Sequence, residues 1–191
     1  MRVSKQVMAE NNEKIVNEAS RLFRENGIEA TSVADVMGAA GLTHGGFYRH
    51  FASKDELTSA AIDKAFGEII NRLKSDIAQQ GAAKAVDGFV RYYLSEHHVN
   101  SPGNGCPIAA LGAEVDRQSK VHNREISRGS EQLLGLIAQA IEGTPEEART
   151  KATGLLALLV GSLVLARSAK SKRAMNETLS SGHRLAKLCI T

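Results

Sequence analysis

The chain has 191 residues, two cysteines and a formal net charge of +3; this length suits one sizeable domain or a small domain joined to a larger one, and two cysteines exclude a disulfide framework. The longest apolar run, residues 154–166, has thirteen residues and is too short to span a membrane, and the N-terminus has no apolar signal-peptide core. We therefore expect a cytoplasmic protein that does not enter a membrane.

All periodic segments of the sequence have helical spacing, and no alternating strand pattern is present, so we predict an all-α protein. Residues 1–9 lack a clear period, and we interpret them as a mobile terminus. From about Glu10 to Asn26 the apolar residues recur every three or four positions. Asn26 and Gly27 then end this first helix.

Residues 31–54, TSVADVMGAAGLTHGGFYRHFASK, predict two short helices joined by a glycine turn. The first of these helices has one apolar stripe, and Thr31 or Ser32 caps its free amides. Gly41 suits the left-handed backbone that usually follows a helix C-terminus. We expect Thr43 to cap the second helix.

The second helix, residues 44–51, is two turns long and must therefore pack against its neighbours. Phe47 and Phe51 share its inner face, while Tyr48 and Arg49 lie on the opposite side. A phenol suits a phosphate, and a guanidinium suits a phosphate or a guanine edge. Two crossed helices with an exposed second helix of this composition fit the major groove of DNA.

This stretch resembles the DNA-binding domain of the TetR family of bacterial transcriptional repressors. The resemblance rests on T-x-V-x-D-V, then A-G-L-T-H-G-G-F-Y-R-H-F, then S-K-D-E-L, preceded by A-S-R-L-F-R-E-N-G-I. It implies a helix-turn-helix domain at residues 1–52 and a helical ligand-binding and dimerisation domain at residues 53–191, with about nine helices. By resemblance, the residues that contact DNA are Ser32, Thr43, His44, Gly45, Gly46, Tyr48, Arg49, His50 and Lys54.

Two of these positions depart from the commonest family pattern, which has Lys at position 44 and Ser or Thr at position 46. Residues 1–54 carry seven Lys and Arg against six Asp and Glu. Binding would therefore rest on a few placed contacts in a dimer and not on bulk charge. The alternative is that Tyr48, Arg49 and His50 form only the solvated face of a helical domain.

Further helices follow along the rest of the chain. Ser53 begins the next one, and Glu56 closes its capping box. Thr144, followed by Pro145, is an equally complete start signal. The helices that we predict after residue 52 cover about residues 53–80, 82–98, 106–119, 123–142, 145–167 and 174–190.

The helix that begins at Pro145 is apolar nearly all round from Leu155 to Leu165, so it must be covered on more than one side. The simplest cover is a second copy, with the last two helices of each partner, about residues 145–190, forming a four-helix bundle where the family dimerises. The alternative is a monomer's central core. In the last helix we expect Leu179, Leu185 and Leu188 to be buried. A homodimer would place two reading helices about 34–36 Å apart on pseudo-palindromic double-stranded DNA.

Cys106 lies between Gly105 and Pro107, so its thiol should lie at a helix N-cap, where the helix dipole lowers the pKa of a thiol. The run G-C-P-I-A-A-L-G-A-E-V is similar to one subgroup of the family, in which some members respond to electrophiles or oxidants through this cysteine. The alternative is a buried, inert side chain beside a pocket for an apolar small-molecule effector. The polar residues that we expect around such a pocket are Arg91, Tyr92, His97, His98 and Glu114.

Adjacent His97 and His98 point about 100° apart on a helix, and no partner follows at ligand spacing, so we predict no metal and no cofactor. The sequence has no phosphate-binding Gly-rich loop, G-x-S-x-G or H-E-x-x-H motif, which argues against an enzyme. We predict a repressor released from its operator by a small-molecule effector or by modification of Cys106. A structural Cys106 with a non-covalent ligand, and a helical binding protein that no longer reads DNA, are the alternatives.

Overall fold

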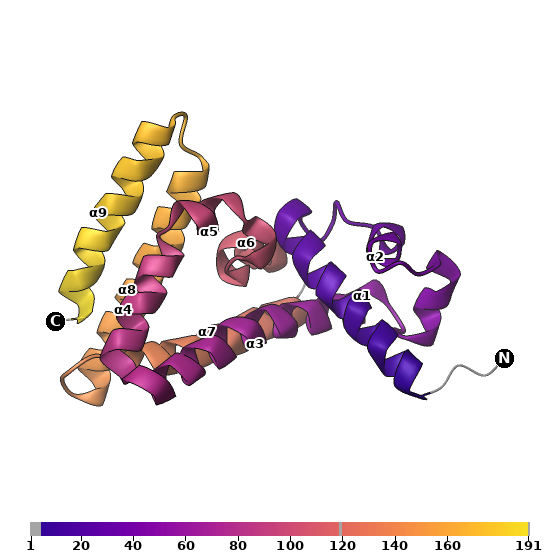
Figure 1. The fold of residues 1–191 in the computed structure, drawn as a ribbon, viewed down its shortest axis with the longest axis horizontal. Helices are drawn as coiled ribbons and strands as arrows, with labels where there is room; N and C mark the ends of the chain where they lie inside the picture. Colours follow the sequence, from indigo (N-terminus) through magenta and orange to yellow (C-terminus); the bar gives the residue numbers. More distant parts are fainter. Residues whose placement is uncertain (1–4, 119, 191) are drawn as a thin grey trace. The chain divides into compact units, whose positions relative to one another are not determined.

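The computed structural model describes residues 5–118 and 120–190, and every regular element in these ranges is a helix (Figure 1). The predicted all-α class is confirmed. In chain order the elements are α1 (Lys5–Asn26), α2 (Val33–Ala39), the 3₁₀ helix η1 (His44–Arg49), α3 (Lys54–Gln80), α4 (Ala82–Tyr93), α5 (Glu96–Asn100), the 3₁₀ helix η2 (Pro102–Asn104), α6 (Pro107–Gln118), α7 (Lys120–Ala138), α8 (Pro145–Arg167) and α9 (Lys172–Ile190).

The chain forms two compact units. Unit 1 comprises Met1–Phe66 and Pro102–Ile126, and unit 2 comprises Gly67–Ser101 and Ser127–Thr191. The helix α6 therefore clusters with the N-terminal helices, although it follows them by more than forty positions in the sequence. The predicted division into domains at residue 52 stays a prediction, because a sequence-defined domain need not coincide with a compact unit.

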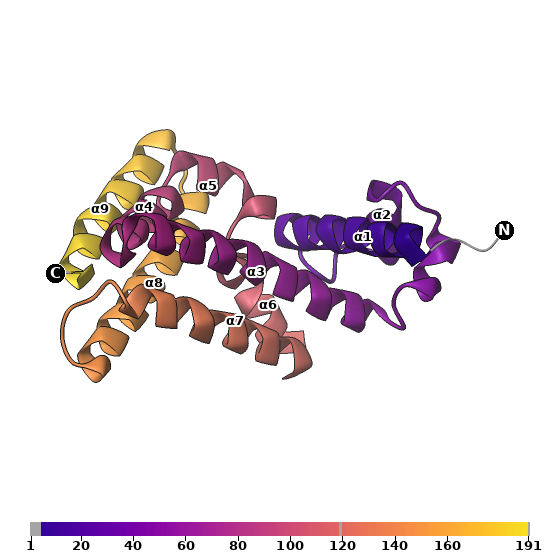
Figure 2. The same cartoon turned by 60° about the horizontal axis from the view of Figure 1, so that its bottom comes forward.

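In unit 1, α1 packs against α2, η2 and α6 (Figure 2). Its apolar stripe gives the first layer of the core, and α2, η1 and the start of α3 contribute the second. Large side chains from four elements are almost fully buried, as expected for a close-packed interior. These side chains are Ile15 and Phe23 of α1, Met37 of α2, Phe47 of η1 and Leu57 of α3.

The first helix begins earlier than its sequence pattern indicates. Helix α1 starts at Lys5, so the predicted mobile terminus is wrong for residues 5–9, while residues 1–4 lie outside the described residues. A hydrogen bond of 3.0 Å joins the amide of Gln6 to the carboxylate of Glu10, four residues on. Such pairs stabilise a helix without an apolar stripe, so periodicity alone does not reveal this turn.

Two predicted boundaries in the middle of the chain are also corrected. The helix predicted to reach His98 ends at Tyr93, because the Ser95 hydroxyl accepts a hydrogen bond from the His98 amide and begins α5. A serine side chain competes in this way with the regular helix. Helix α7 ends at Ala138, and hydrogen bonds between residues three apart carry the chain on to Ile141.

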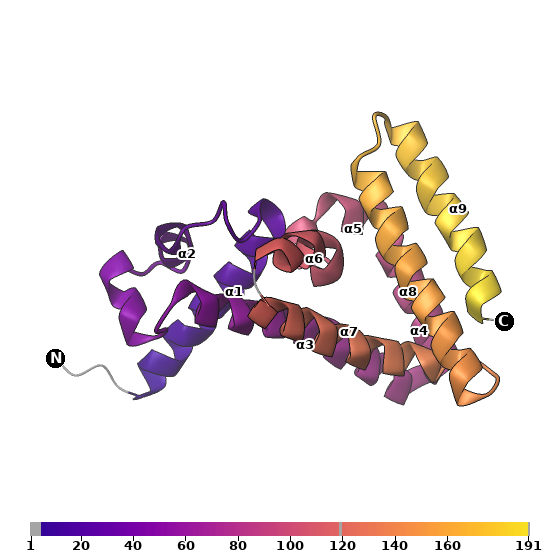
Figure 3. The ribbon, with the colours of Figure 1, turned by 180° about the vertical axis from the view of Figure 1, so that it is seen from behind.

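In unit 2, α8 and α9 lie antiparallel and side by side (Figures 1 and 3). They approach closely at Gly182, where a Cβ atom would lie 2.8 Å from the Ser162 hydroxyl oxygen. By length and composition alone, α8 is apolar enough to cross a membrane, which the uninterrupted run of thirteen residues did not indicate. The buried core helix of a water-soluble protein has the same property, and 39% of the most apolar window of α8 is buried.

Candidate nucleic-acid interface

Helix α2 begins at a complete capping box. The Ser32 hydroxyl accepts a hydrogen bond from the Asp35 amide across 3.1 Å, and the Asp35 carboxylate accepts one from the Ser32 amide across 2.8 Å. The Ser32 hydroxyl also donates a hydrogen bond of 2.6 Å to the Asp35 carboxylate, and this bond foremost, together with the one from the Ser32 amide, lowers the pKa of Asp35 below its usual value. The prediction that Ser32 or Thr31 caps this helix is confirmed for Ser32. Its partner Asp35 was not predicted, although Asp three residues after Ser is a recognisable signal.

The turn after α2 has the predicted glycine geometry. Gly41 has a φ of +70°, and the amide of Leu42 bonds the carbonyl of Met37 across 2.8 Å. This arrangement satisfies carbonyls that a helix end otherwise leaves without partners. Thr43 occupies the N-cap position of the next helix, but its side chain makes no capping bond, so its predicted capping role is wrong.

The reading helix is a 3₁₀ helix and not the α-helix that we predicted. Its amides bond carbonyls three residues back, as from Gly46 to Thr43 (2.9 Å) and from His50 to Phe47 (2.8 Å). Two adjacent glycines and a length of six residues disfavour a regular α-helix. Phe47 anchors this short helix: its side chain is 1% exposed, and its ring stacks on Phe51 at a centroid distance of 5.9 Å.

The outer side of η1 is open. Tyr48 is 73% exposed, and its ring meets the buried Phe47 ring edge-on at 5.2 Å. Residues three apart overlie one another in a 3₁₀ helix, so Tyr48 and Gly45 share one edge of η1. No atom lies within 4 Å of the place that a Gly45 Cβ would take, so nothing blocks the approach of another molecule there. Arg49 is also exposed.

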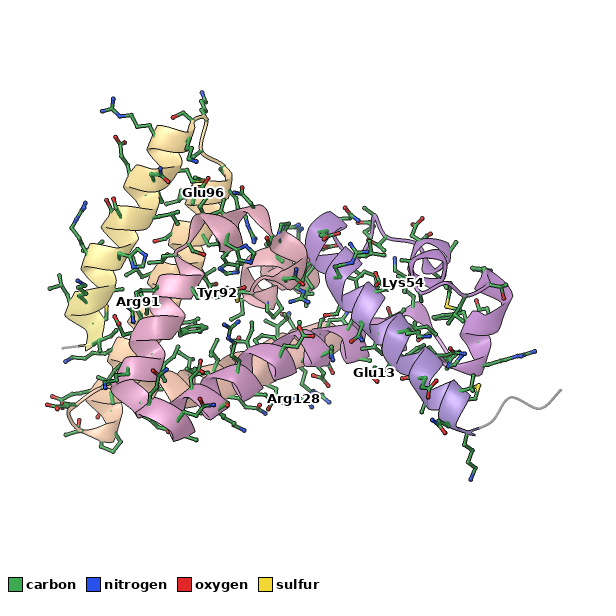
Figure 4. The ribbon with its side chains drawn as sticks, in the orientation of Figure 1. Glu13, Lys54, Arg91, Tyr92, Glu96 and Arg128 are labelled. Carbon is green, nitrogen blue, oxygen red and sulfur yellow. The ribbon has the colours of Figure 1, made fainter. Side chains whose placement is uncertain are left out.

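The other predicted DNA-contact residues differ in exposure. Thr43 and His44 are exposed, whereas Gly46 and His50 are half-buried. The Ser32 hydroxyl also donates to the Asp35 carboxylate, so any DNA contact must share it. The half-buried Lys54, which is labelled in Figure 4, donates from its ammonium group to the Ile28 carbonyl across 2.6 Å.

Four of the predicted effector residues belong to unit 2. Arg91 and Tyr92 lie near the end of α4 (Figure 4). Arg91 pairs with Asp87 at the surface across 2.9 Å. The buried His98 ring lies 2.8 Å from the Tyr93 carbonyl oxygen and stacks on Tyr92 with centroids 5.6 Å apart. His97 is exposed and lies 6.1 Å from the Tyr92 ring. Tyr92 and the two histidines are thus brought together.

The remaining two effector residues, Cys106 and Glu114, belong to unit 1. Cys106 is the residue before α6, and its carbonyl accepts a hydrogen bond from the Ala110 amide, so the predicted N-cap position is confirmed. Its side chain is only 1% exposed. The Glu114 carboxylate accepts hydrogen bonds from the amides of Ile28 and Glu29. No sequence pattern indicated this contact, because 86 and 85 positions separate the partners.

Comparison with known proteins identifies the class of site. Residues 15–61, from the middle of α1 to the start of α3, match the family model of bacterial regulatory proteins, tetR family. Over 179 residues the chain is 23% identical to the HTH-type transcriptional repressor NemR of Escherichia coli (strain K12). The aligned residues make up 88% of this chain and 89% of NemR. Residues 15–61 are therefore a DNA-binding region of the tetR family type.

Solved structures agree with this TetR fold. The reduced form of E. coli NemR superposes with a TM-score of 0.79 at 21% identity, covering 95% of this chain and 97% of NemR. A TetR transcriptional regulator from Legionella pneumophila gives a TM-score of 0.79 at 20% identity, with 100% of both chains covered. The chain is a DNA-binding transcriptional regulator with a TetR-like fold, and its predicted place in a G-C-P subgroup stays a prediction.

Proposed function

We propose that this regulator is a cytoplasmic repressor of the TetR family, which binds a pseudo-palindromic operator as a homodimer and leaves the operator when an effector acts. The single observation that carries this proposal is the geometry of η1. Its outer edge presents Tyr48 and the open position at Gly45, while Phe47 anchors the helix from below. A rigid short helix with an open outer edge suits insertion into a major groove.

Within this proposal, the exposed residues of η1 have separate roles. Arg49 contacts a guanine edge or a phosphate, and the hydroxyl of Tyr48 donates a hydrogen bond to a phosphate. The exposed Thr43 and His44 lie at the N-terminus of η1, where free amides favour a phosphate. Phosphate contacts position the reading helix, whereas base contacts select the sequence.

The dimer surface is argued from apolar side chains that remain exposed in the single chain. Leu185 and Leu188 of α9 are 51% and 71% exposed, so the expectation of burial is not met within one chain. Val164 and Leu165 of α8 are 43% and 64% exposed. Large apolar side chains that are exposed on two adjacent helices mark an interaction surface. A second copy would cover it by pairing α8 and α9 with their twofold equivalents.

The effector acts in one of two ways, and a different observation favours each. The position of Cys106 at the N-terminus of α6 favours a reactive thiolate, because the helix dipole stabilises negative charge there. The solved structure of the relative NemR is of a reduced form. The 1% exposure of Cys106 favours a packing role, with a non-covalent apolar ligand as effector.

A mobility-shift titration tests both parts of this proposal, the binding to an operator and the role of Cys106 in release. The wild type and Cys106→Ser are each bound to DNA from upstream of the protein's own gene, exposed to a quinone or hypochlorite, and then returned to reductant. We expect the untreated wild type to shift this DNA at low salt. No shift with any DNA from the locus would refute the repressor. If only the wild type is released from the DNA, and reductant reverses this release, Cys106 is the trigger. If both proteins or neither are released, Cys106 is not the trigger, and the effector is a non-covalent ligand.

A further inference from the structure

The turn between α1 and α2 is held by a carboxylate from α6, which belongs to the second sequence segment of unit 1. The Oε2 atom of Glu114, on α6, accepts a hydrogen bond from the Ile28 amide across 3.1 Å, and Oε1 accepts one from the Glu29 amide across 2.8 Å. Hydrogen bonds to a charged acceptor are stronger than those between neutral groups. The two bonds together fix both the position and the orientation of this turn.

The same turn is held from a second side. Lys54, the first residue of α3, donates to the Ile28 carbonyl across 2.6 Å, so the Ile28 peptide is bonded on its carbonyl side as well as its amide side. Within the turn, the Thr31 hydroxyl donates to the Gly27 carbonyl across 2.8 Å. The turn is therefore bonded to α6, to α3 and to itself.

The backbone of the turn matches this attachment. Gly27 has a φ of +91°, which side-chain-bearing residues rarely adopt. A Cβ atom at this position would lie 3.0 Å from the Glu114 Oε2 atom, closer than such atoms normally approach. A glycine thus lets the carboxylate reach the two amides that follow it.

Helix α6 is attached to α1 at a second point. The buried Arg24 guanidinium donates to the Gly105 carbonyl, just before α6, across 2.8 Å and also binds the Ser20 carbonyl and hydroxyl. One end of α6 is therefore bonded to the last turn of α1, and Glu114, two turns along, is bonded to the residues that follow α1. The position of α6 and the position of the turn before α2 are coupled.

We propose that Glu114 is a positioning residue for operator binding: from α6 it holds the turn that sets where α2 and η1 begin. This inference rests on the proposed function, because operator affinity is its readout. Helix α2 starts at Val33, four residues after the second bonded amide, and η1 packs on α2. Loss of the carboxylate removes the two bonds from α6, so the turn is held less firmly and the reading helix adopts more orientations, of which few fit the groove.

Electrostatics and positioning predict opposite signs, which makes the inference testable. A carboxylate repels DNA, so its removal should strengthen binding if charge alone matters. If Glu114 positions the turn, its removal should weaken binding. Asp116 offers a matched control, because it is an exposed carboxylate on the same helix and bonds only the Asn123 side chain among the interactions described for it.

The experiment compares the full-length wild type, Glu114→Ala, Glu114→Gln and Asp116→Asn. Operator dissociation constants are measured by mobility shift, and exchange of the Ile28 and Glu29 amides is measured by NMR. We expect Glu114→Ala to raise the dissociation constant about tenfold and to speed exchange at both amides. Glu114→Gln, which keeps one acceptor oxygen, should give a smaller effect. Asp116→Asn should bind DNA as tightly as the wild type or more tightly.

Each contrary result identifies what has failed. Unchanged amide exchange in Glu114→Ala, at equal helix content by circular dichroism, would overturn the inference whether or not an operator is known. Faster exchange with unchanged or tighter operator binding would reduce Glu114 to a structural contact and also overturn it. Failure of the wild type itself to bind DNA from its locus would instead refute the repressor function.

Discussion

The ammonium nitrogen of Lys54 donates a hydrogen bond to the carbonyl oxygen of Ile28, across 2.6 Å. The family resemblance assigns Lys54 to a DNA phosphate, and the two roles compete for one side chain. A lysine ammonium has three protons, so it is able to serve both partners only if both lie within its reach. The salt dependence of operator binding separates the two roles.

Lys54→Met keeps the apolar stem of the side chain and removes its charge. If the ammonium also contacts a phosphate, this variant should lower the slope of log affinity against log salt by about 0.9 per subunit. If it bonds only Ile28, the slope should stay constant and the free energy of unfolding should fall by about 1 kcal/mol. Salt titrations and thermal melts measure the two quantities. A steeper slope would contradict both roles.

Arg49 is exposed on η1 and pairs with no carboxylate among the described residues. If it reads a base edge, Arg49→Ala should cost about 1–3 kcal/mol of binding free energy per contact and reduce discrimination against mutated operators. Arg49→Lys is the control, because it keeps the charge and loses the bidentate geometry. Equal affinity and equal discrimination in Arg49→Ala would remove this residue from the interface.

Ser32→Ala removes the side-chain cap of α2, and Thr144→Ala removes the equivalent cap of α8. Each should lower the free energy of unfolding by about 1 kcal/mol, because each leaves helix amides without a partner. Only Ser32→Ala should also weaken operator binding, since α2 supports η1. Denaturant unfolding and mobility shifts measure the two effects. Equal operator affinities in both variants would show that the α2 cap does not position η1.

Acid should weaken the same cap. Its hydrogen bonds to Ser32 lower the pKa of Asp35 in the folded state. The stabilisation is therefore complete above the ordinary carboxyl pKa of about 4 and is lost as the pH falls through the lower, folded value. We expect the wild type to lose more stability between about pH 5 and pH 3 than Asp35→Asn does. Asp116→Asn, which lies in no cap, should follow the wild type instead. Parallel curves for the wild type and Asp35→Asn would contradict the assignment.

Local signals were the part of this structure that the sequence predicted well. The cap at Ser32, the capping box at Thr144 and the left-handed Gly41 each depend on residues within a few positions, and all were confirmed. The burial of Phe47 followed from its spacing in the reading helix. Its 3₁₀ geometry did not, because helix periodicity over six residues does not distinguish hydrogen bonds three residues apart from those four apart.

Contacts between distant segments were not predictable in the same way. The contact from Arg24 to Gly105 spans 81 positions, and neither residue type indicates a partner. Glu114 was assigned to a ligand pocket only because it lies near Cys106 in the sequence. In the structure its carboxylate accepts hydrogen bonds from the amides of Ile28 and Glu29, and every residue except proline has such an amide. A side chain that bonds backbone leaves no signature in the residue that it bonds.

The exposed leucines provide the test of the dimer. Leu165 and Leu188 are 64% and 71% exposed, and burial at a twofold interface would stabilise the dimer by about 1.5–3 kcal/mol for each leucine in each subunit. The double variant Leu165→Glu with Leu188→Glu should therefore be a folded monomer in sedimentation. It should also lose operator affinity, because one reading head contacts only half of a pseudo-palindrome.

Asn176→Glu is the control for the added charge, because Asn176 is exposed on α9. It lies nine positions before Leu185, which puts the two side chains on opposite sides of the helix. It should stay dimeric and bind the operator. If the leucine variant also stays dimeric, the copies must pair through another surface, and the spacing of the two reading heads has to be derived from that surface. If the control dissociates instead, charge on α9 and not loss of apolar contact separates the subunits.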